Sequence, residues 1–138
     1  MSAWEHELVE GPKDPRAREL WLQHAAGFII FENVRRYAIE RIDPALSEDA
    51  RPAVQKGIDD AVYGLMMVID GVSGGLSNAS QTVSIDFAAR LESGGDSGND
   101  EVLMEVDLRR GDGMCMGYHG WLEGNYGEHP VAAPKPSR

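Results

Sequence analysis

The stretch "VLMEVDLRRGDGMCMGYHGW", residues 102–121, decides the predicted fold. Its first half alternates apolar side chains with mostly polar ones, which is typical of a strand that buries one face. The apolar set is Val102, Met104, Val106 and Leu108. The segment "RRGDGM" that follows, residues 109–114, is a strong hairpin signal. We therefore predict that residues 114–121 return as a strand antiparallel to residues 102–109.

The length of this turn decides which side chains of the returning strand face the core. A slip of one residue moves every side chain to the opposite face. A turn of two residues would bury His119 and expose Tyr118, whereas a turn of three would bury Tyr118 and expose His119 and Trp121. We favour three residues because Glu105 then lies opposite His119 and Leu103 opposite Trp121. Such cross-strand pairs contribute about 0.2–1 kcal/mol each.

A second strand is predicted over residues 82–91, where apolar side chains again alternate with polar ones. Its inward set is Val83, Ile85, Phe87, Ala89 and Leu91. The glycine-rich and acidic segment "ESGGDSGND", residues 92–100, would join it to the strand over 102–109 as a long hairpin loop. These patterns predict an antiparallel sheet of three strands, or slightly more.

Two helices are predicted before the sheet. The first runs from Pro15 to about Ile42, with Asp14 as its N-cap. The second begins near Ser47 and ends at Gly71 or Gly74. Two helices on one face of an antiparallel sheet form the simplest two-layer α+β arrangement. We assign residues 1–14 to an irregular lead-in, 15–128 to a single α+β domain, and 129–138 to a proline-rich tail that is extended or disordered.

Composition limits the class of function. The 138 residues form one domain with a net charge of −10, and residues 45–107 hold twelve acidic against three basic residues. Such a charge repels nucleic acid and attracts basic partners. No apolar run is long enough for a membrane span, no signal peptide is evident, and the single cysteine fits a reducing compartment. These features favour a cytoplasmic protein.

The predicted register gives the sheet an acidic outer face with an apolar centre. We interpret this face as the site that binds a basic protein partner, as an immunity-type inhibitor of a toxin would, with no cofactor and no catalytic residue. Trp121 would be the anchor, since exposed aromatic side chains dominate many interfaces. An alternative is that the lead-in, with Trp4, or the tail covers this spot. The candidate residues are Asp86, Leu103, Glu105, Asp107, His119 and Trp121.

Other functions remain as alternatives. Glu105 and His119 are candidates for a metal-binding or hydrolytic site, although no established catalytic or metal motif occurs in the sequence. Met114, Cys115, Met116 and His119 include ligand types of a soft metal, but strand alternation would place Cys115 and His119 on one face and both methionines on the other. A homodimer that packs two outer sheet faces together is a third alternative. Asp59, Tyr63 and Asp70 share one face of the second helix and form another candidate contact.

Overall fold

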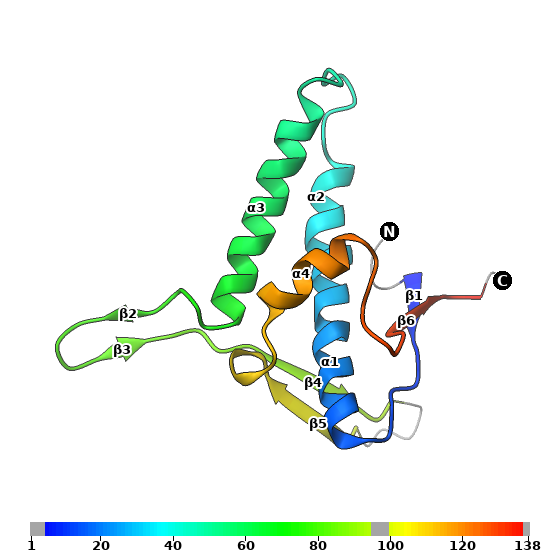
Figure 1. Ribbon diagram of the computed structural model, residues 1–138, viewed down its shortest axis with the longest axis vertical. Helices are drawn as coiled ribbons and strands as arrows, with labels where there is room; N and C mark the ends of the chain where they lie inside the picture. Colours follow the sequence, from blue (N-terminus) through cyan, green and yellow to red (C-terminus); the bar gives the residue numbers. More distant parts are fainter. Residues whose placement is uncertain (1–4, 95–99, 137–138) are drawn as a thin grey trace.

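A long helical segment forms the centre of the fold in the computed structural model, which describes residues 5–94 and 100–136 (Figure 1). Helix α1, Pro15–Ile30, continues through a π-helical turn, Phe31–Arg35, into α2, Arg36–Glu40. The Asp14 side chain accepts a hydrogen bond of 2.9 Å from the backbone N–H of Ala17. This is the predicted N-cap, and it satisfies a backbone donor that the helix leaves free.

Helix α3, Arg51–Ile69, lies beside α1 and α2 (Figure 1). It begins with Pro52 in its first turn, where proline is tolerated because the N–H it lacks would be unpaired there. Val62, Met66 and Ile69 are its buried residues. The chain leaves the helix through Gly71, whose φ of +75° suits glycine. Both predicted helices are therefore present.

The predicted hairpin between residues 82–91 and 102–109 is present in shorter form. Strand β4, Ala88–Glu92, pairs antiparallel with β5, Val102–Asp107, and Arg90 lies opposite Glu105. Met104 and Val106 face inward toward α1, while Glu105 faces outward. The predicted alternation is confirmed from Leu103 to Asp107, whereas Val102, predicted to face inward, is 51% exposed. The fold is of the α+β class.

The predicted third strand is wrong, because residues 114–122 form a helix. Helix α4, Met114–Leu122, follows a short 3-10 turn, Leu108–Arg110, and contacts α1 and α3. The sheet β4–β5 thus has two strands in the described part of the chain, and α1 is the helix that covers it. The second predicted helix packs mainly on other helices, so the proposed two-layer arrangement does not describe the molecule.

Two further small sheets use segments outside the predicted core. Strand β1, His6–Leu8, pairs antiparallel with β6, Ala132–Pro134, so the lead-in and the tail are held together. Strand β2, Leu76–Ser77, pairs with β3, Thr82–Val83, in a hairpin that projects from the body (Figure 1). The predicted strand 82–91 is consequently divided between β3 and β4. Trp4 lies outside the described residues.

The core is rich in aromatic side chains. Trp121 stacks on Tyr126 at 6.0 Å between ring centroids and meets the Phe31 ring edge to face. A Cβ on Gly27 of α1 would lie 2.5 Å from the Trp121 ring, so glycine is what allows the indole to fit there. Among the described residues, no helix is long and apolar enough to cross a membrane.

Candidate interaction surface

Four of the six residues predicted to bind a partner lie on or next to one surface. Leu103, Glu105 and Asp107 point outward from β5, and Asp86 directly precedes the β4 region. Leu103 is 49% exposed, as the sequence predicted for the apolar centre of this face. The register of β5 therefore places Leu103, Glu105 and Asp107 on its outer face, and the role of all four residues in binding stays a prediction.

The prediction that Trp121 is an exposed anchor is wrong. Its side chain is 4% exposed and packs in the aromatic core between α1 and α4. His119 is exposed on α4, where its ring lies 6.2 Å from that of Tyr63. Neither side chain lies on the outer face of β5, because residues 114–122 form a helix that packs against α1 and α3.

Arginine side chains compensate much of the negative charge on the outer face of β4–β5. Arg90 pairs with Glu105 at 2.9 Å, and Arg109 pairs with Asp86 at 3.2 Å. Asp107 accepts a hydrogen bond from the backbone N–H of Arg109. Exposed pairs of this kind add little stability, but they make the local electrostatic potential less negative. The face is therefore less acidic than its sequence predicts.

The two candidate residues of the predicted metal or hydrolytic site, Glu105 and His119, lie on different elements. Glu105 of β5 is paired with Arg90 of β4, whereas His119 of α4 lies against Tyr63. The two predicted ligands are therefore not brought together. Within residues 5–94 and 100–136, no three His, Cys, Asp or Glu side chains are grouped to hold a metal ion. Burial, reinforced by Asp70, raises the pKa of the Cys115 thiol to about 11, which disfavours the nucleophilic thiolate at neutral pH.

Two of the polar residues that line a hollow of about 200 Å³ beside α4, Gln23 and Asp112, are paired with each other. Gln23 donates a hydrogen bond of 2.9 Å to Asp112, which also pairs with Arg16. Burial lowers the pKa of His24, so its neutral form is favoured at the rim of the same hollow. Side chains already bound to one another in this way hold α1 against the segment before α4, which is a structural role.

The face of α3 that carries Asp59, Tyr63 and Asp70 contacts α4 within the same chain. Asp70, at the end of α3, accepts hydrogen bonds from the backbone N–H groups of Met114 and Cys115 and so caps α4. The Tyr118 hydroxyl donates to the backbone carbonyl of Asp59 at 3.0 Å. Helix α4 therefore covers the stripe of Asp59, Tyr63 and Asp70 that was a candidate contact for a dimer.

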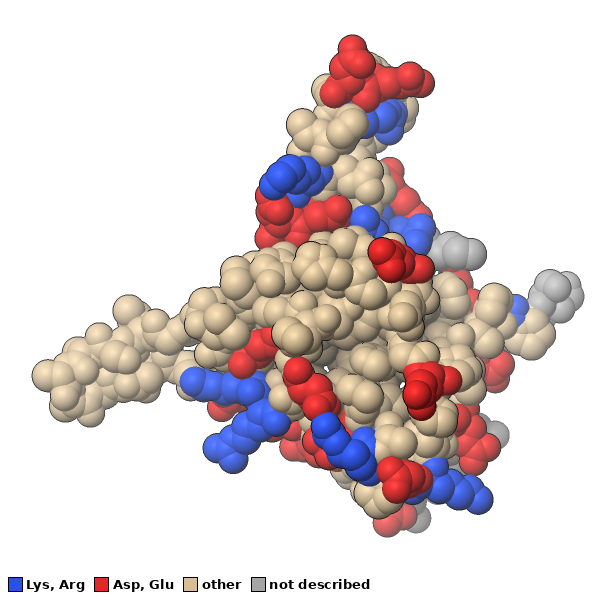
Figure 2. Space-filling view, viewed as in Figure 1, with Lys and Arg blue, Asp and Glu red and all other residues tan. Residues whose placement is uncertain are grey.

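Sequence reasoning missed the most exposed apolar surface, which we call the arm and define as residues 72–85. Every residue of the arm is exposed, and none is charged. Leu76 and Val83 are 75% and 65% exposed, lie opposite each other in the β2–β3 pair, and so share one face. Figure 2 shows the arm as an uncharged projection from a body that carries both signs of charge.

The opposite face of the arm is polar. Ser77 and Thr82 are paired across it, with their hydroxyl oxygens 2.9 Å apart. Asn78 closes the turn by accepting hydrogen bonds from the backbone N–H groups of Ser80 and Gln81. The arm is thus a formed amphipathic hairpin. Its one sequence signal is a run of fourteen residues without charge in a chain where 26% are charged.

In comparisons with known proteins, no family model, curated protein or solved structure matches this chain. Function is therefore inferred from the surfaces and side-chain chemistry of the chain itself.

Proposed function

We propose that this chain is a binding protein that works through protein–protein contact, with the arm as its principal contact surface. The observation that carries the proposal is the amount of surface left exposed. A compact 15.1 kDa chain exposes about 7,100 Å² by the usual scaling with mass. This chain exposes 9521 Å², about a third more, which supports a protein that buries further surface against a partner.

The position of the arm supports the same function. A two-stranded hairpin is at best marginally stable by itself in water, and contacts on a hydrophobic face are what usually stabilise it. Leu76 and Val83 present such a face, and no other part of the described chain buries it. Exposed apolar side chains that lie side by side, as these two do, are typical of a surface that another protein covers.

A photo-crosslinking experiment in the cell that makes the protein tests the proposal. A photoreactive amino acid is placed at Leu76 or Val83, and at Met116 as a matched control, since Met116 is an exposed apolar residue of α4. We expect covalent protein adducts from both arm positions in excess of those from Met116. Arm positions that give no more adducts than Met116 would contradict the proposed function.

The outer face of β4–β5 supports a second candidate, in which the partner is a basic protein such as a toxin domain. Leu103 is the favouring observation, since it is a half-exposed apolar residue on the same face of β5 as Glu105 and Asp107. Binding at this face should weaken as salt rises, because screening reduces attraction between opposite charges. It should also weaken in Leu103→Ala, measured by titration calorimetry. Affinity that ignores both changes would exclude this face.

A further inference from the structure

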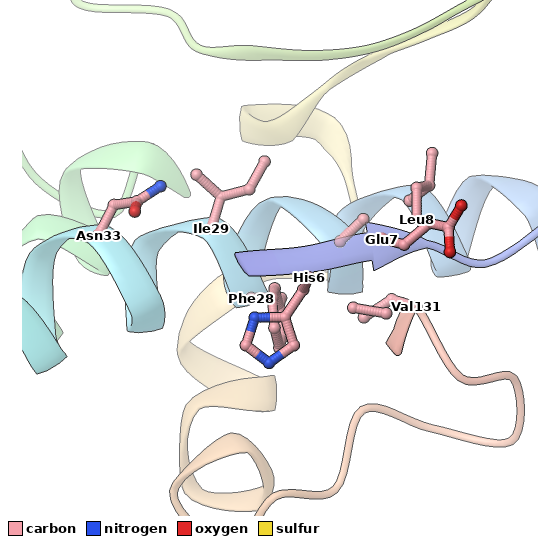
Figure 3. A pocket seen from close by; sticks show the side chains of 9 residues that line it. His6, Glu7, Leu8, Phe28, Ile29, Asn33 and Val131 are labelled. Carbon is pink, nitrogen blue, oxygen red and sulfur yellow. The ribbon is translucent and has the colours of Figure 1, made fainter. Parts of the chain in front are cut away.

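An apolar groove runs along α1 on the side of the body away from α4. Two adjoining hollows, of about 420 and 340 Å³, share Leu8, Ala25 and Ile29. Leu8 comes from β1 and Ile29 from α1, and Figure 3 shows both beside the smaller hollow. The larger hollow extends to residues 88–91 of β4. We call the two hollows together the α1 groove; most of its lining is apolar, with His6, Glu7, Asn33 and Arg90 as the exceptions.

One side of the α1 groove is a strand that has a second edge. In the described residues, β4 pairs with β5 alone, along one of its two edges. Four consecutive residues of β4, Ala88 to Leu91, line the groove. Side chains of a strand alternate between its faces, so a run of consecutive residues borders a space that lies along the strand's edge. An added β-strand would find unpaired backbone groups there as well as an apolar floor.

We propose that the α1 groove receives the arm of a second copy of this chain, so that two copies exchange arms in a symmetric dimer. This inference rests on the proposed function and names its partner. The arm supplies what the groove lacks: an extended hairpin with Leu76 and Val83 on one face and no charged side chain. Ile29, at 52% exposure, and Leu8 are the apolar groups that the arm would cover.

The size of the uncovered surface suits a second copy. Dimers that are permanent bury about 2,000 Å² or more in total. The excess exposed surface of each chain, about 2,400 Å² over the expectation for its mass, is sufficient for an interface of that class. In a symmetric exchange, each arm–groove contact occurs twice, so one pair of complementary surfaces provides the whole interface.

Charge also bears on this choice. Two copies carry −10 each and repel one another, so a stable contact must form where charge is sparse. The arm has no charged side chain, and Ala25 and Ile29 make the floor of the groove uncharged where they line it. Dimer affinity should therefore rise with salt, because screening reduces the repulsion. A basic partner on the outer face of β4–β5 would show the opposite dependence.

Sedimentation equilibrium of the full chain tests the exchange. We expect a dimer, and we expect dissociation constants at least about tenfold higher for the arm variant Leu76→Lys/Val83→Lys and for the groove variant Ile29→Lys. The control variant Met116→Lys makes the same apolar-to-cationic change at an exposed site outside both surfaces and should dimerise like the parent. Each added lysine makes the net charge of −10 one unit less negative, so general repulsion between the copies cannot cause the loss. Circular dichroism checks that each variant is folded.

Mixing the two variants gives the sharpest outcome. Each variant alone forms only a weakened dimer, but the intact arm of the groove variant fits the intact groove of the arm variant. We expect a mixed dimer that is tighter than either variant's own dimer. A monomeric parent chain would overturn the exchange, as would a groove variant that dimerises normally. Crosslinking of the arm to a different protein would then retain the proposed function, whereas absence of any arm adduct would remove both.

Discussion

Helix α4 and the arm differ in a way that reverses what the sequence predicts for each. Trp121, predicted to be exposed on a strand, is buried on a helix. Val83, predicted to be buried on a strand, is exposed at 65% on the projecting hairpin. The comparison shows that apolar character and spacing indicate which side chains favour burial. They do not indicate whether another part of the same chain buries them.

The largest expected difference between the two regions is in core stability. Trp121→Ala should lower the free energy of unfolding by about 3–5 kcal/mol, because the aromatic cluster loses its central ring. Leu76→Ala should change it by no more than about 0.5 kcal/mol, since an exposed side chain loses little packing. Urea denaturation at a dilution where the chain is monomeric provides both values. Equal losses at the two sites would mean that the arm packs on its own chain.

Adding a single methyl group sharpens the same contrast. Gly27→Ala should cost about 1–3 kcal/mol, because its Cβ would lie 2.5 Å from the Trp121 ring. Gly75→Ala in the arm should leave stability within about 0.5 kcal/mol, since nothing lies within 4 Å of that Cβ. Gly57→Ala in α3 is the control for helix propensity and should stabilise by about 0.5–1 kcal/mol. Thermal unfolding that ranks Gly27→Ala as stabilising would refute this account of the Trp121 site.

Two side chains that cap backbone N–H groups provide a third comparison. Asp70→Ala should cost about 0.5–2 kcal/mol, because α4 loses the acceptor for its first N–H groups. Asn78→Ala removes a similar acceptor from the turn of the arm and should loosen that turn alone. Amide hydrogen exchange should show faster exchange across α4 in the first variant and only at residues 78–82 in the second. Faster exchange of α4 in Asn78→Ala would contradict this independence.

The smallest expected effect concerns pH. Burial lowers the pKa of His24 in the folded chain, so the unfolded chain binds this proton more readily. The His24 contribution is therefore complete above the unfolded pKa of about 6.5 and declines as pH falls below it. His24→Gln should flatten the loss of stability between pH 7 and 5, measured by urea denaturation. The arm residues 72–85 contain no titratable side chain, so Leu76→Ala should leave that slope unchanged.

Several parts of the fold were predictable because their causes are local. The Asp14 cap and Pro15 define where α1 begins, and both effects act within one helical turn. The alternation of Leu103 to Asp107 defines the two faces of β5, because strand geometry alone separates successive side chains. This alternation places three of the six candidate residues, Leu103, Glu105 and Asp107, on the outer face of β5, and their role in binding stays a prediction.

The conformation of residues 114–122 was not predictable, because its cause is not local. Helix α4 has Gly113 at its N-cap position, with no side-chain cap from its own sequence. Its cap is Asp70, which lies 44 residues earlier in the chain, and the turn signal around Asp112 resembles that of a hairpin. A prediction from local pattern cannot include an acceptor that only folding brings near.

The sequence by itself determined helices α1 and α3, the β4–β5 pair and the absence of charge in the arm. Tertiary structure alone decided that Trp121 is buried and that Leu76 and Val83 are not. The physical reason is that local periodicity follows from backbone geometry, which each segment contains. Burial depends on which surfaces meet, and for the arm the described chain provides no such surface of its own.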